Sequence, residues 1–103
     1  MQNVHAATYL GSGGTTCNQY MEYKKSQPDV SSGIDLWLLG YLSGMNFMSA
    51  IATEKFYNID QDLLKTFDAK TLLFFINKYC SKNGSNTLNN AANDLFLALK
   101  KTQ

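Results

Sequence analysis

The stretch GIDLWLLGYLSGMNFMSAIATE, residues 33–54, decides the fold of this 103-residue chain. Its apolar residues recur with a helical period, which predicts one long helix. The positions that keep this period are Ile34, Trp37, Leu38, Tyr41, Leu42, Met45, Met48 and Ile51-Ala52. Leu36, Leu39 and Phe47 lie off that stripe, so the helix is apolar on most of its sides. Such a helix belongs at the centre of a helical bundle or in an interface.

Three shorter helices are predicted around this one. The first covers Cys17–Lys25 with Thr16 as its cap, and Pro28-Asp29 breaks it before Ser31 or Ser32 starts the long helix. The next covers Ala69–Ser81 behind the cap Asp68, and the last covers Leu88–Lys101 behind Thr87. The stretch between residues 54 and 67 is expected to be irregular. No useful length alternates with a period of two, so no strands are expected.

The sequence therefore predicts an all-α fold, a small four-helix domain over residues 16–103. Residues 1–15 end in Gly11-Ser12-Gly13-Gly14-Thr15 and are predicted to form a flexible N-terminal arm. Residues 36–53 carry no formal charge, and an uncharged run of this length is near the minimum for crossing a bilayer. Polar residues and two glycines dilute this run, and Asp35 and Glu54 bracket it. We do not expect it to span a membrane.

Two cysteines, Cys17 and Cys80, lie more than half the chain apart. This spacing fits no metal site, which needs several ligands close together in sequence. An even count at wide separation indicates one long-range disulfide, and two buried thiols or a reactive cysteine are the alternatives. A disulfide between them closes a loop of about 64 residues and predicts an oxidising compartment.

The N-terminus supports export. Val4-x-Ala6 is a small-residue pattern of the kind found before a signal-peptidase site. No hydrophobic segment precedes it, so we expect the sequence to begin just inside a precursor whose signal peptide has been removed, with Met1 as an added start. The expected location is periplasmic or secreted.

The composition argues against several functional classes. Nine lysines, scattered along the chain, and no arginine give a net charge of +1, which is unlike a nucleic-acid reader. The single histidine, His5, lies in the predicted arm, and no nucleophile has a recognisable base partner. Asp60-x-Asp62 lacks the rest of a calcium loop. We expect no enzyme activity, no cofactor and no metal.

The predicted interface lies on the long helix. Gly40-x-x-x-Gly44 makes a smooth strip, and each glycine inside a helix costs about 1 kcal/mol relative to alanine. Another backbone is therefore expected to approach closely there, from the same chain by default or from a second copy or partner helix. Trp37, Tyr41 and Phe47 flank the strip and are predicted to be core residues or interface anchors.

The order of these features resembles a known family. The segments that carry the resemblance are Thr16-Cys17-Asn18-Gln19-Tyr20-Met21, a proline break, Leu39-Gly40-Tyr41-Leu42-Ser43-Gly44, Tyr79-Cys80-Ser81-Lys82-Asn83 and a last helix ending in lysines. Over residues 16–101 they resemble the HdeA/HdeB family of small periplasmic helical proteins, in which one disulfide joins the first helix to the end of the third. The Trp37 to Gly44 stretch also resembles the amidase immunity proteins of type VI secretion.

The resemblance implies a periplasmic chaperone that dimerises at neutral pH and binds unfolded proteins after acid exposure. In strong acid the eight carboxylates are neutralised, so the side-chain charge rises from +1 to about +10. We therefore expect a non-enzymatic, protein-binding domain, an HdeA-like acid-stress chaperone, with unfolded clients or a possible homodimer as its partners. The alternatives are a periplasmic inhibitor or immunity protein with one dedicated partner, and an accessory subunit of an envelope or secretion assembly.

Overall fold

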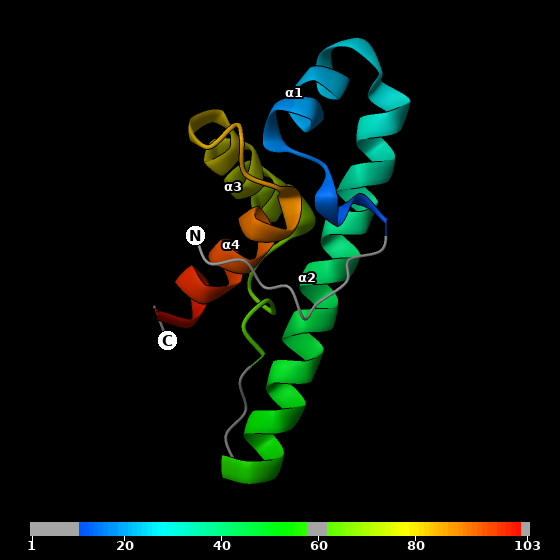
Figure 1. The fold of residues 1–103 in the computed structure, drawn as a ribbon. Coiled ribbons are helices and arrows are strands. Elements are labelled where there is room, and N and C mark those ends of the chain that lie inside the picture. Colours follow the sequence, from blue (N-terminus) through cyan, green and yellow to red (C-terminus); the bar gives the residue numbers. More distant parts are fainter. Residues whose placement is uncertain (1–10, 58–61, 102–103) are drawn as a thin grey trace.

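The computed structural model describes residues 11–57 and 62–101, apart from the side chains of residues 53–57. Its elements are a short 3-10 helix η1 (Ser12–Gly14) and four α-helices, α1 (Cys17–Ser26), α2 (Pro28–Tyr57), α3 (Ala69–Lys82) and α4 (Leu88–Lys101) (Figure 1). The described part of the chain contains no β-strand, only a single bridge between Thr16 and Thr87. The predicted all-α, four-helix fold is confirmed.

The long helix α2 begins earlier than its apolar period predicts. Pro28 is its first residue rather than a break before it, and the carbonyl of Gln27 accepts hydrogen bonds from the N–H groups of Val30 and Ser31, at 3.0 and 3.1 Å. Proline suits the first position of a helix because its φ is already helical and the N–H that it lacks would have no partner there. The helix has 30 residues, about 45 Å, and extends along most of a molecule whose longest dimension is 46 Å.

The predicted caps of α1 and α3 are present. The Thr16 side chain accepts from the N–H of Gln19 at 3.1 Å, while the Gln19 side chain accepts from the N–H of Thr16 at 3.0 Å, which completes a capping box. Asp68 accepts from the N–H of Thr71 at 2.8 Å, and this bond lowers the pKa of the Asp68 carboxyl.

Backbone hydrogen bonds join the first turns of α1 and α4 to neighbouring loops. The N–H groups of Cys17 and Asn18 donate to carbonyls of the α3–α4 loop, at Asn86 (2.8 Å) and Gly84 (2.9 Å), and the N–H of Leu88 donates to the carbonyl of Thr15 at 2.8 Å. Groups in the first turn of a helix have no partner within their own helix. A Cβ on Gly84 would meet the Asn18 side chain, so a larger residue there would displace that side chain.

The disulfide joins Cys17 in the first turn of α1 to Cys80 near the end of α3, with Cα atoms 4.9 Å apart across a sequence separation of 63. Both cysteines are buried. The core around them comes from all four helices and from the segment before α3, and its largest fully buried side chains include Tyr20, Leu38, Leu42, Ile76 and Leu88. The predicted disulfide therefore lies inside the core.

The other helices lie on one side of α2, with α1 against its N-terminal part and α3 and α4 further along (Figure 1). The chain returns from α2 to α3 through residues 62–68, which Asn46 holds in place. Its side-chain carbonyl accepts from the N–H of Leu63 at 2.8 Å, and its amide donates to Asp62 at 2.7 Å. The C-terminal part of α2 projects beyond the bundle (Figure 1).

Residues 1–10 of the predicted N-terminal arm, including His5, and residue Asp60 lie outside the described residues. Residues 12–14 form η1, which packs against α2 and α4 and buries Gly13. None of the described helices is both long enough and apolar enough for a membrane crossing.

Candidate functional site

The most exposed apolar surface among the described residues is one face of α2. Its large members are Leu36, Phe47, Met48 and Ile51, with exposed fractions of 72%, 62%, 64% and 41%. Gly33, Gly40 and Gly44 are exposed on the same side of the helix. We call these seven residues the outer face. Single exposed hydrophobic residues are ordinary, but several on one side of a helix indicate an interaction surface.

The opposite face of α2 belongs to the core. Ile34, Leu38 and Leu42 are 5%, 0% and 0% exposed. The helical period placed Met48 and Ile51 on the same stripe as these residues, but the structure leaves both of them exposed. The reason is tertiary: the stripe drifts around the helix axis, and the helix extends past the described elements that cover Leu38 and Leu42, which leave Met48 and Ile51 exposed.

The glycine strip has no close neighbour within the described chain. A Cβ built on Gly33, Gly40 or Gly44 would meet no atom of the described residues within 4 Å, leaving aside the helix's own backbone nearby. No described residue therefore makes the close intramolecular approach that is expected by default at this strip. The strip instead lies within the outer face, between Leu36 and Phe47.

Trp37 and Tyr41 lie beside the glycine strip but are more buried than the outer face. Their rings stack with centroids 5.0 Å apart and planes inclined by 10°, and both are partly buried against the core. The Tyr41 hydroxyl donates to Asn93 of α4 at 2.8 Å. A Cβ on Gly11 would lie 2.5 Å from the Trp37 indole nitrogen, and Gly11 has a φ of 81°, which favours glycine.

The five predicted interface residues thus fall into two groups. Gly40, Gly44 and Phe47 lie together on the outer face, whereas Trp37 and Tyr41 connect α2 to η1 and α4. The sequence could not separate these groups, because all five belong to a helix that is apolar on most sides.

In the sequence, charged residues occur at both ends of the outer face, Asp35 before Leu36 and Glu54 after Ile51. Asp35 lies one residue before Leu36 and accepts a 2.5 Å hydrogen bond from the buried hydroxyl of Tyr20 in α1. Burial, together with this bond to a carboxylate, raises the pKa of Tyr20. Between Leu36 and Ala52 the helix has no ionisable side chain apart from the Tyr41 hydroxyl, which is bonded to α4. A partner on this face would therefore not have to desolvate a charge.

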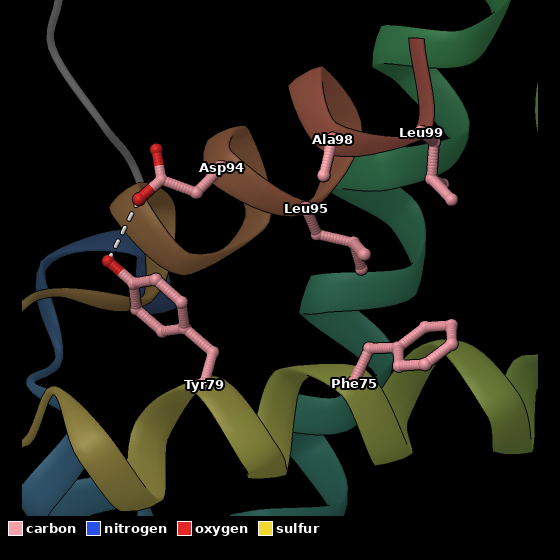
Figure 2. A pocket seen from close by; sticks show the side chains of 6 residues that line it. All are labelled: Phe75, Tyr79, Asp94, Leu95, Ala98 and Leu99. Carbon is pink, nitrogen blue, oxygen red and sulfur yellow. Dashed lines mark hydrogen bonds between the residues drawn. The ribbon is translucent and has the colours of Figure 1, made fainter. Parts of the chain in front are cut away.

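A second, smaller feature is a groove between α3 and α4 with a volume of about 330 Å³, lined by Phe75, Tyr79, Asp94, Leu95, Ala98 and Leu99 (Figure 2). The Tyr79 hydroxyl donates to Asp94 at 3.0 Å and accepts from the Asn86 amide at 2.7 Å. Desolvation raises the pKa of Tyr79, and the Asp94 carboxylate acts in the same direction. The groove is apolar except at this end, and its size is at the lower limit for a small-molecule site.

The apolar periods predicted the helices of this groove but not the groove itself. Phe75, Leu95 and Leu99 follow the predicted periods of α3 and α4. No pattern pairs Tyr79 with Asp94, because they meet only through the packing of two helices. Nothing in the groove forms a nucleophile and base pair, and no three metal-ligating side chains gather among the described residues.

Comparison with protein-family models, with curated proteins and with solved structures yields no match to this chain.

Proposed function

We propose that this chain is a non-enzymatic, protein-binding domain of an oxidising compartment, the periplasm, and that it binds its protein partner through the outer face of α2. The observation that carries this proposal is the group of exposed apolar side chains Leu36, Phe47, Met48 and Ile51 on one side of α2, which contains no charged residue and is left uncovered by the described helices. Apolar patches of this kind on small domains are typical of protein interaction sites.

The shape of the outer face favours a helix or another flat element as the partner surface. Gly40 and Gly44 lower the profile of α2 at the middle of the outer face, so that a partner can approach the backbone closely. Phe47 and Leu36 stand on either side of this low point and are exposed enough to act as anchors. The buried disulfide between Cys17 and Cys80 supports an extracytoplasmic location, since such bonds persist mainly in oxidising compartments.

The two roles within this class require an exposed outer face at different pH. A dedicated inhibitor or accessory subunit needs the outer face at neutral pH, where it is already exposed on the single chain. An HdeA-like chaperone needs it in acid, and the rise in side-chain charge from +1 to about +10 favours loosening of any complex that covers the face there.

The test compares the wild-type chain with Leu36→Glu, which places a charge on the outer face, and with Phe74→Glu on α3. Phe74 is a matched control because its side chain is 60% exposed and lies on a different helix. At neutral pH, tagged protein is incubated with periplasmic extract and the bound proteins are identified by mass spectrometry. At pH 2–3, the same three proteins are mixed with an aggregating client and light scattering is followed.

We expect one of the two assays to show binding by the wild type and by Phe74→Glu. In that assay Leu36→Glu should bind the partner or client at least about tenfold more weakly, because burying an unpaired charge is costly. A stoichiometric partner at neutral pH identifies the inhibitor or subunit role, and suppressed scattering in acid identifies the chaperone. Equal behaviour of all three proteins in both assays contradicts the proposal.

A further inference from the structure

The groove between α3 and α4 has one polar end and an apolar remainder. Figure 2 shows Tyr79 and Asp94 together at one end and the side chains of Phe75 and Leu99 toward the other, with Leu95 and Ala98 between them. Small-molecule sites are typically apolar and orient their ligand through a few polar groups. A ligand that lies along this groove therefore needs an apolar body and one polar end.

The polar end of the groove accepts hydrogen bonds, and its side chains have no proton left to donate. The Tyr79 hydroxyl has a single proton, which it donates to Asp94 at 3.0 Å, while its oxygen accepts from the Asn86 amide at 2.7 Å. Desolvation raises the pKa of Tyr79, so the hydroxyl keeps this proton at neutral pH. A carboxylate only accepts, and its two oxygens can accept several bonds, so Asp94 has acceptor capacity beyond the bond from Tyr79. The polar end therefore suits a ligand group that donates.

Charge narrows the choice among donating groups. The side chains that line the groove include the carboxylate of Asp94 and no basic residue. A cationic ligand group is attracted to this end, whereas a ligand carboxylate or phosphate is repelled. Because Asp94 is exposed, water screens the attraction, and most of the affinity must come from the apolar body of the ligand.

We propose that the groove between α3 and α4 binds a small amphiphilic amine, whose apolar body packs against Phe75, Leu95 and Leu99 and whose ammonium group donates to Asp94. The groove volume of about 330 Å³ suits a body of one ring or a short alkyl chain, since small-molecule sites begin at roughly 300 Å³. This site is formed by α3 and α4 and not by the outer face of α2, so it does not depend on the proposed function.

Three probes with the same aromatic ring test the charge of the ligand. Phenethylamine is cationic at neutral pH, phenethyl alcohol is neutral and phenylacetate is anionic. Binding is followed by NMR, through the shifts of the methyl signals of Leu95, Ala98 and Leu99 in isotope-labelled protein. We expect a Kd on the order of 1 mM for phenethylamine, as is usual for so small a ligand. Phenethyl alcohol should bind about fivefold more weakly and phenylacetate at least about tenfold more weakly.

A variant of Asp94 tests the contact with the ammonium group. Asp94→Asn removes the charge and keeps an oxygen that can accept from Tyr79. It should weaken phenethylamine binding about fivefold and change phenethyl alcohol binding by less than about twofold. Glu22→Gln is the matched control, because it removes the same charge from an exposed position on α1 and should leave the affinities for all three probes unchanged.

A variant of Ala98 tests the location. Ala98 is exposed in the middle of the groove, so Ala98→Leu should fill this space, leave the protein folded by circular dichroism and weaken the binding of every probe at least about tenfold. Equal affinities of the wild type for the three probes, or a preference for the amine that survives in Asp94→Asn, overturn the proposed ligand class. If no probe shifts the three methyl signals, or if Ala98→Leu binds as well as the wild type, the groove is not the site.

Discussion

The two sides of α2 are similar in composition and opposite in structural role. On the inner side, Leu38 and Leu42 are fully buried in the core that α2 shares with α1, α3 and α4, and the disulfide lies in the same core. On the outer face, Leu36 and Phe47 are 72% and 62% exposed. Hydrophobicity alone therefore does not identify the core of this protein.

The inner side of α2 carries the stability of the fold, while the outer face is exposed among the described residues. An apolar helix that is covered on one side only leaves an exposed patch on the other, and such patches mark interaction surfaces. Substitutions on the two sides should consequently separate stability from association.

The largest expected effect is removal of the disulfide on the inner side. Replacing Cys17 and Cys80 together with alanine should lower the free energy of unfolding by about 4 kcal/mol, because the unfolded chain regains the freedom of a long closed loop. Small domains are stable by only about 5–15 kcal/mol, so the variant should be close to unfolding. Urea titrations followed by circular dichroism measure this change.

The outer face supplies the control for this prediction. Leu36→Glu should leave the urea midpoint of the monomer close to that of the wild type at protein concentrations where both are monomeric. If the cysteine variant unfolds at the same urea concentration as the wild type, the core rather than the covalent bond holds α1 against α3.

Most of the fold could be predicted from the sequence because its determinants are local. The caps Thr16 and Asp68 and the apolar periods of α3 and α4 place three helices to within one residue at either end. The predicted start of α2 was wrong because proline occurs both just after a helix and in the first turn of one, and the sequence alone did not distinguish the two.

The candidate site was predictable only in part. The glycine strip and Phe47 were recognised as interface candidates, but Leu36, Met48 and Ile51 were not, since exposure depends on how far the covering helices extend along α2. The groove at Tyr79 and Asp94 was missed for a related reason, because its two polar residues come from different helices and meet only in the packed structure.

A smaller effect comes from matched truncations on the two sides of α2. Leu38→Ala should destabilise the protein by about 3 kcal/mol, since it removes buried methyl groups and leaves a cavity in a closed core. Leu36→Ala should change the stability of the monomer by less than about 0.5 kcal/mol, because its side chain is already mostly in water. Thermal or urea unfolding of both variants measures the difference. Equal losses would show that Leu36 is covered in the single chain.

The smallest effect concerns the hydrogen bond that joins α1 to α2 on the inner side. Tyr20→Phe removes the hydroxyl that donates to Asp35, and near pH 8 it should cost about 1.5 kcal/mol, as expected for a bond to a charged acceptor. Lys24, which lies 5.1 Å from the centre of the Tyr20 ring, keeps an aromatic neighbour in the variant, so the change isolates the hydroxyl.

This cost should depend on pH in one direction. Because the pKa of Tyr20 in the folded protein is raised above its ordinary value of 10.0, the stabilisation from the hydroxyl is fully present below pH 10 and is lost as the pH rises toward the folded pKa. At pH 11 the unfolded Tyr20 is mostly ionised while the folded one is not, which removes about 1.4 kcal/mol from the wild type that the phenylalanine variant does not lose. Urea midpoints of the two proteins should therefore converge between pH 8 and pH 11. A constant difference over this range would mean that the Tyr20 hydroxyl ionises as readily in the folded chain as in the unfolded one.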